Sequence, residues 1–164
     1  MITTHEKSRQ TLVVVVLLAI CIAMAGCSPA TRTPVAAEKT GTGQRRVDTE
    51  PLTQRFPLIG DPVRVVWYSG TTGSGGAPGP STYWIDAVIT LDAATAAQIR
   101  DSYDLKPTND VPEVADQLKP DIPSGLWASA ELNTALVQGG DPPFTASAYY
   151  SPSSQQIVIC AVGQ

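Results

Sequence analysis

Residues 83–91 constrain the fold more than any other stretch, because every second side chain along them is apolar while the positions between are mixed. The odd positions carry Tyr, Ile, Ala, Ile and Leu, and the even positions include Trp84 and Asp86. Alternation with a period of two is typical of a β-strand, in which successive side chains point to opposite faces of a sheet. We therefore predict a strand that turns one face toward a core and carries Trp84 and Asp86 on the other.

Two β-hairpins follow from patterns of the same kind. Residues 63–68 are rich in β-branched and aromatic side chains and predict a strand, and the Gly/Pro-rich residues 69–81 predict a long loop that joins it to the strand at 83–91. Residues 144–150 and 157–162 predict a second hairpin near the C-terminus. The last run is apolar at every position, which indicates a strand in the interior of the sheet.

Three segments between the hairpins predict helices. Asp92 is a typical N-cap for a helix that begins at Ala93. Residues 110–119 carry apolar side chains at i, i+3, i+4 and i+7, the stripe of an amphipathic helix. Residues 131–137 predict a third, short helix, and residues 126–128 a short strand. The expected fold is α+β, an antiparallel sheet of about four strands with two to three helices packed on one face.

The N-terminal segment combines a basic start with an apolar run. Lys7 and Arg9 precede residues 12–25, which are almost uninterrupted apolar. The run is shorter than the roughly 20 residues that a helix needs to span a bilayer. A short apolar run behind a basic start, ending in small residues, is typical of an export signal.

The residues Met-Ala-Gly-Cys at 24–27 resemble the lipobox of bacterial lipoproteins. The resemblance implies that a lipid is attached to the thiol of Cys27 and that residues 1–26 are removed as a signal peptide. It also implies a protein anchored to the cell membrane on its extracytoplasmic face, because several acyl chains make a stable anchor. The alternatives are an uncleaved anchor, or a secretory signal in which this cysteine is incidental.

The rest of the chain divides into a tether and one domain. Residues 27–54 are polar behind the lipidated cysteine and show no helical or strand period, so we expect a flexible tether. Residues 55–164 are long enough for a single globular α+β domain. Within it, Arg-Phe-Pro-Leu at 55–58, Pro-Gly-Pro-Ser at 78–81 and Tyr-Trp-Ile-Asp-Ala-Val at 83–88 resemble a group of small uncharacterised lipoproteins of high-GC Gram-positive bacteria. That resemblance implies an envelope protein without implying an activity.

The histidine and cysteine content excludes several kinds of site. The chain has one histidine, His5, and it lies in the segment that signal cleavage would remove. A mature chain without histidine has no Ser-His-Asp or Cys-His nucleophile system and no histidine-ligated metal. Cys160 lies in the apolar run at 157–162, where a cysteine usually acts as a small hydrophobic residue rather than a reactive thiol. We therefore expect no cofactor and no metal.

Charge and loop composition narrow the classes of ligand. A net charge of -4 argues against a nucleic-acid partner, which normally requires a basic patch. The acidic stretch at 101–121 lacks the spacing of a calcium-binding EF-hand loop, so a solvated acidic face is favoured over a calcium site. The Gly-rich residues 69–81 are not followed by the Gly-Lys-Ser/Thr of a phosphate-binding loop, and a flexible hairpin loop is favoured there.

Asp86 is the candidate for a catalytic carboxylate. A sugar-cleaving enzyme needs two carboxylates about 5–10 Å apart across a cleft. Glu131 or Asp61 would be the second carboxylate, although the sequence does not bring either one to Asp86. The alternative is an exposed strand residue without a catalytic role, because antiparallel sheets often keep one polar face.

Aromatic residues suggest a binding surface. Tyr68, Trp84 and Tyr149 fall on the face of the sheet expected to be outward, where an exposed aromatic cluster would suit a protein or glycan partner. The alternative is that a second layer, residues 120–140, covers them. Which of the two holds depends on the tertiary structure.

These observations favour a lipid-anchored extracytoplasmic protein that is a non-enzymatic binding or envelope-interaction module. Its expected partners are the membrane, through Cys27, and an envelope protein or glycan. The alternative is a small cell-envelope enzyme, such as one that acts on glycans, that uses Asp86 with a second acidic residue. The oligomeric state is left open.

Overall fold

An antiparallel sheet of seven strands organises the residues that the computed structural model describes, which are 39–40, 43–72, 82–140 and 143–163. They belong to one compact unit, Ala37–Gln164. The strand order is β1-β2-β3-β7-β6-β5-β4. The strands are β1 Lys39–Thr40, β2 Arg64–Thr72, β3 Thr82–Thr90, β4 Lys106–Pro107, β5 Trp127–Ala128, β6 Phe144–Ser151 and β7 Gln156–Gly163.

The four long strands form the two predicted hairpins. β2 pairs with β3, and β6 pairs with β7, both antiparallel. The apolar strand β7 joins the hairpins by pairing also with β3, so its predicted interior position is confirmed. The α+β class and the antiparallel sheet are confirmed as well. The expected number of strands was too low, because β1, β4 and β5 extend the sheet by two residues each.

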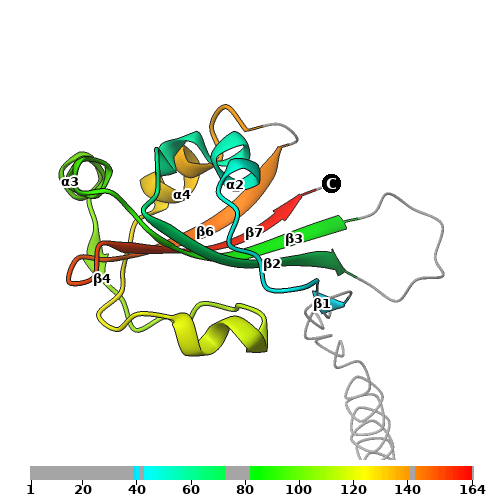
Figure 1. Ribbon diagram of the computed structural model, residues 1–164. Helices are drawn as coiled ribbons and strands as arrows, with labels where there is room; N and C mark the ends of the chain where they lie inside the picture. The colour runs from blue at the N-terminus through cyan, green and yellow to red at the C-terminus, as the bar shows by residue number, and fades with distance from the viewer. Residues whose placement is uncertain (1–38, 41–42, 73–81, 141–142, 164) are drawn as a thin grey trace, which may run out of the picture. The chain divides into compact units, whose positions relative to one another are not determined.

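Three α-helices pack against one face of the sheet, which we call the inner face. They are α2 Glu50–Arg55, α3 Ala93–Ser102 and α4 Ala130–Leu136, and a short 3-10 helix η1, Pro57–Ile59, follows α2. Figure 1 shows α2 and α4 on one side of the sheet. The predicted N-cap is confirmed, because the Asp92 carboxylate accepts hydrogen bonds from the backbone N–H groups of Ala94 and Thr95.

The two faces of the sheet form two separate apolar clusters. Alternate residues of one strand enter different clusters: Ile85 and Ala87 of β3 join the helices, whereas Trp84 and Val88 lie on the opposite, outer face. Burial of apolar surface on both faces supplies the main driving force for folding. The alternation that the sequence shows over residues 83–91 is therefore confirmed, but the outer face is covered rather than open.

The cover of the outer face replaces a predicted helix. Residues 110–119 do not form an α-helix; the chain is extended through Ala115 and then forms the 3-10 helix η2, Asp116–Asp121. An α-helix would direct the N–H of Ala115 to the carbonyl of Val111. That N–H instead donates to the Asp86 carboxylate at 2.7 Å. The apolar stripe still serves a packing role, since Leu118 is fully buried in the outer cluster.

The folded domain begins earlier than predicted. Residues 43–54 were assigned to the tether, but the backbone of Arg46 exchanges two hydrogen bonds with Trp67 of β2. Leu52 of α2 is fully buried in the inner cluster. One buried apolar side chain and backbone pairing with β2 thus hold in the domain a segment whose composition is otherwise polar.

Candidate functional site

A buried ion pair occupies the outer layer of the sheet. Asp86 projects from β3 and is fully buried. Its carboxylate oxygens each lie 2.7 Å from Nζ of Lys39, which belongs to the edge strand β1. The N–H of Ala115 donates to the same carboxylate. Three donor contacts thus compensate a charge that would otherwise be strongly unfavourable inside a protein.

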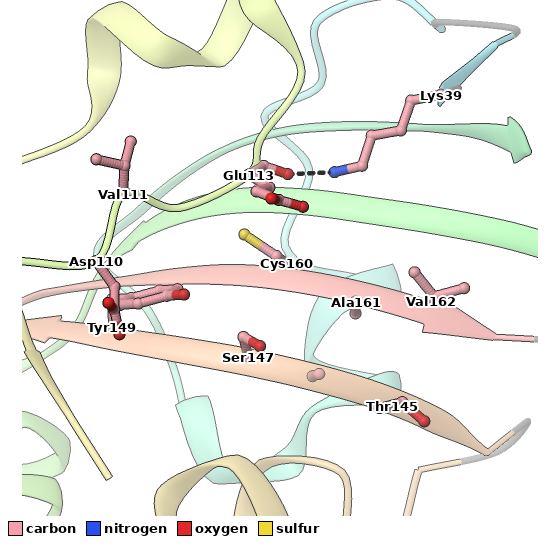
Figure 2. A pocket seen from close by; sticks show the side chains of 11 residues that line it. Lys39, Asp110, Val111, Glu113, Thr145, Ser147, Tyr149, Cys160, Ala161 and Val162 are labelled. Carbon is pink, nitrogen blue, oxygen red and sulfur yellow. Dashed lines mark hydrogen bonds between the residues drawn. The ribbon is translucent and has the colours of Figure 1, made fainter. Parts of the chain in front are cut away.

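Lys39 has further partners besides Asp86. Its ammonium donates to the backbone carbonyl of Glu113 at 2.6 Å and lies 5.4 Å from the ring centroid of Trp84. Figure 2 shows this ammonium directed at Glu113. Lys39 therefore connects the edge strand, the interior of the sheet and the covering segment.

Burial raises the pKa of Asp86 above its usual value, while Lys39 and the Ala115 N–H oppose the shift. The ammonium lies at bonding distance from both carboxylate oxygens, so the pair is ionic. A carboxylate that is fully covered and has its oxygens occupied does not contact a substrate. Asp86 thus holds β1 and the covering segment against β3, a structural role that differs from both the catalytic and the exposed-strand predictions.

The proposed second carboxylates lie elsewhere. Glu131 is in the first turn of α4, on the inner side of the sheet, opposite the side that holds the Asp86 carboxylate. Asp61 is exposed and follows η1, whose Ile59 also packs in the inner cluster. Neither residue lines a groove with Asp86, so the structure does not bring together the carboxylate pairs that the sequence suggested.

The predicted aromatic surface is largely covered. Tyr68, Trp84 and Tyr149 do lie on the same face, but Trp84 is fully buried and Tyr68 is nearly so. Only Tyr149 is partly exposed. The covering segment runs from Val114 to Leu126 rather than over residues 120–140. The prediction of an exposed aromatic cluster is therefore wrong for two of its three members.

An outer groove remains where the covering segment leaves β6 and β7 open. It encloses about 500 Å³ between the chain at Val111 and Glu113 and the strands that carry Ser147 and Cys160 (Figure 2). Burial, followed by the nearby negative charges, raises the pKa of the partly exposed Tyr149.

Cys160 lies on the floor of this outer groove and is a poor nucleophile. Desolvation, reinforced by the charge of Asp86, raises the pKa of its thiol to about 12. A thiol with this pKa is almost entirely protonated at neutral pH, and the thiolate is the reactive form. The geometry agrees with the predicted role of Cys160 as a small hydrophobic residue, since it packs against the outer cluster.

A second and larger groove, which we call the aromatic groove, lies on the inner side near the end of the β2–β3 hairpin. It encloses about 690 Å³. Aromatic residues on three strands line it, the almost fully buried Trp67 of β2, Tyr83 of β3 and Phe144 of β6. Tyr83 is half exposed, so its ring is available to a ligand.

The polar rim of the aromatic groove comes from α2 and the chain before it. Glu50, Gln54 and Arg55 lie along one side, and the guanidinium of Arg46 stacks on the Trp67 ring at 3.9 Å. The Trp67 indole N–H donates to the carbonyl of Asp48, which holds this corner in place. A cavity that combines aromatic walls with a few directed polar groups is the usual form of a small-molecule site.

Sequence reasoning missed the aromatic groove because it assigned the residues of the rim to a tether. A local signal was present: Pro51 suits the first turn of a helix, and Leu52 and Phe56 stand four positions apart. Both of these apolar residues are fully buried. The groove itself depends on residues from four separate elements and has no signature in a single stretch of sequence.

The acidic stretch does not converge on a metal site in the part of the chain that the structure describes. No group of three or more Asp, Glu, His or Cys side chains suited to a metal occurs there. Asp101, Asp104, Asp116 and Asp121 each pair instead with a basic side chain.

The predicted signal peptide and the lipidation site Cys27 lie outside the described residues. Among the described helices, none has the length and hydropathy to cross a membrane. Comparison with known proteins found no matching family, no matching curated protein and no matching solved structure. The proposals below therefore rest on the sequence and on the geometry of this chain.

Proposed function

We propose that the chain is a lipid-anchored extracytoplasmic protein whose domain is a non-enzymatic binding module of the cell envelope. The proposed membrane anchoring rests on the apolar run at 12–25 and on the lipobox-like residues that end at Cys27. The anchor holds the domain at the membrane, and the domain presents its grooves to an envelope component.

The aromatic groove is the observation that carries the binding role. It is the larger of the two grooves described, and it combines the half-exposed ring of Tyr83 with charged and amide groups of α2. Aromatic rings supply apolar contact area at little cost in conformational entropy, and polar rim groups supply orientation. This division of roles is suited to recognition and does not require a reactive group.

The alternative of a carboxylate-based enzyme loses its principal residue. Asp86 is fully buried and bound by Lys39, so it serves the fold. Activity through Asp86 would require the covering segment to leave, which would also expose Trp84 and Leu118 to water. The binding module needs no such opening.

A site-specific photocrosslinker in intact cells tests this proposal. A benzophenone amino acid replaces Tyr83, which lines the aromatic groove, and in a matched variant it replaces Val63, which is more exposed and lines neither groove. Benzophenone reacts with C–H bonds and therefore captures proteins and glycans alike. We expect a discrete adduct from position 83 and none from position 63. Equal labelling from both positions, or none from position 83, would show that the groove does not bind an envelope component.

A further inference from the structure

Arg55 is the cation of the aromatic groove that has no anionic partner among the residues that the structure describes. Its Nη1 donates to the carbonyl of Pro51 at 2.9 Å, which leaves the other guanidinium donors without a carboxylate among the described residues. Every other lysine and arginine in that part of the chain, except the exposed Arg64, is paired with an aspartate. Arg55 is also half-buried, so an unpaired charge there is costly.

The neighbours of Arg55 define what else a ligand would meet. Glu50 accepts a hydrogen bond from the side-chain amide of Gln54 at 3.2 Å and keeps further acceptor capacity. A ligand that lies beside Arg55 and Glu50 therefore has to bring one negative group and at least one O–H or N–H donor. The Tyr83 and Phe144 rings add an apolar wall.

From this arrangement we infer that the aromatic groove binds an acidic saccharide, a sugar ring that carries a carboxylate or a phosphate. The inference rests on the proposed binding function and names the ligand class for the same groove. The acidic group pairs with the free donors of Arg55, whose planar fork suits carboxylates and phosphates. The sugar hydroxyls donate to Glu50, and the C–H face of the ring packs on Tyr83.

Two features favour an acidic sugar over other anions. The groove offers a single unpaired cation and the chain carries a net charge of -4, so a nucleic acid or another dense polyanion would be repelled. A simple inorganic anion would leave the aromatic wall and Glu50 unused. A ring with hydroxyls and one charge uses each of these groups.

Isothermal titration calorimetry on the full chain in detergent micelles tests the inference. The probes are cellobiouronic acid, which has one carboxylate, cellobiose, in which that carboxylate is a hydroxymethyl group, and cellobiose phosphate. Sodium acetate and inorganic phosphate report binding of the anion alone. We expect the two acidic disaccharides to bind about tenfold or more tightly than cellobiose, because a hydrogen bond to a charged group is lost in the neutral sugar.

Substitutions test whether the disaccharides bind in the aromatic groove. Arg55→Gln is expected to remove the preference for the acidic disaccharides, whereas Arg64→Gln, which removes an exposed arginine outside this groove, leaves it intact. Tyr83→Ser, at an exposed position, weakens acidic and neutral disaccharides together and covers the case in which Arg55→Gln fails to fold. Equal binding of cellobiose and cellobiouronic acid would overturn the inference, as would equal effects of the two arginine variants.

The two proposals fail in different ways. A crosslink from position 83 without any preference for acidic disaccharides would support the proposed binding module and would reject an acidic saccharide as its ligand. The carboxylate and phosphate probes also separate the two sources of charge, since a preference for one over the other identifies the acid. If acetate or inorganic phosphate binds as strongly as the sugars, the groove recognises the anion alone. That result would overturn the inference of a saccharide ligand.

Discussion

Lys39 and Asp86 stand 47 residues apart in the chain, yet the ammonium of one lies 2.7 Å from both carboxylate oxygens of the other. The two residues lie on strands that are not neighbours in the sheet, because β2 lies between β1 and β3. Strand β1 thus supplies the charge that neutralises the one buried carboxylate among the described residues. An ion pair as well as strand pairing therefore holds β1 to the rest of the domain.

Removal of one partner of this ion pair is expected to destabilise the domain strongly. Lys39→Met leaves Asp86 buried without its cation, and breaking a buried pair in this way costs about 3 kcal/mol. Urea unfolding followed by tryptophan fluorescence measures the change. The matched control is Lys119→Met, which breaks an exposed pair with Asp116 and is expected to have little effect. Equal stability of the two variants would contradict the role assigned to Lys39.

The same ion pair predicts a pH dependence with a definite sign. Because burial raises the pKa of Asp86 above 3.8, the folded protein holds this proton more tightly than the unfolded chain. The free energy of unfolding therefore gains a contribution as the pH falls through the folded pKa, and loses it as the pH rises again. Relative to Asp86→Asn, the wild-type protein is expected to become more stable from pH 7 toward pH 4.

Loss of Lys39 should widen that pH dependence. Lys39 lowers the pKa of Asp86, so Lys39→Met raises it further. The destabilisation caused by Lys39→Met is then expected to be larger at pH 7 than at pH 5, where more of Asp86 is protonated. Urea titrations of both proteins at the two pH values measure this difference. A destabilisation that is independent of pH would mean that Lys39 acts through packing alone.

The segment before residue 55 is expected to behave as part of the core. Leu52→Ala removes a fully buried side chain of α2 and should lower the free energy of unfolding by about 3 kcal/mol. Val47→Ala, in the same segment but largely exposed, should change it by less than about 0.5 kcal/mol. If the two variants unfold at the same urea concentration, residues 43–54 are a tether after all.

The thiol of Cys160 is expected to resist alkylation in the folded protein. A pKa of about 12 instead of 9.0 lowers its thiolate fraction at pH 8 by about a thousandfold. Mass spectrometry of iodoacetamide-treated protein measures the reaction at this site, and urea should restore it. Ser147→Cys places a thiol at the exposed position opposite Cys160 on β6 and should react readily without urea. Fast labelling of native Cys160 would show that its thiol is ionised.

The proposed lipidation makes a separate prediction about Cys27. Cells fed an alkyne-tagged fatty acid should label the wild-type chain, and Cys27→Ala should lose both the label and the membrane association. Cys21→Ala is the matched control, because it removes a cysteine from the same N-terminal segment while the lipobox-like residues stay intact. Label on Cys27→Ala would mean that the lipid is attached elsewhere, and membrane association without any label would mean that the apolar run is an uncleaved anchor.

Local pattern was sufficient for the strands and for the helix at α3. The alternation over residues 83–91 and the N-cap Asp92 depend on neighbours within a few residues, and the structure confirms both. The helix predicted over residues 110–119 does not form, because a group far away in the sequence takes a hydrogen-bond donor that the helix would use. The Asp86 carboxylate takes the N–H of Ala115, and local periodicity contains no information about that carboxylate.

The candidate site was harder to predict than the fold. Trp84 and Tyr149 were assigned to the correct face, but whether a face is exposed depends on what packs over it. The aromatic groove combines α2 with three strands, so the spacing of residues in the chain does not identify it. The prediction of a tether over residues 43–54 followed from their polar composition and was wrong. Burial of Leu52 and backbone pairing with β2 hold this segment in the domain, and neither depends on composition.

The sequence by itself determined the four long strands, the side on which each of their residues lies, and the lack of histidine after Cys27. Each of these follows from properties that act within a strand or a turn, or from the amino-acid inventory. Only the tertiary structure decided that Asp86 is buried against Lys39, that Trp84 is covered, and that Arg55 lines the same groove as Tyr83. Burial and pairing are properties of surfaces brought together from distant parts of the chain, and they exist only once the chain has folded.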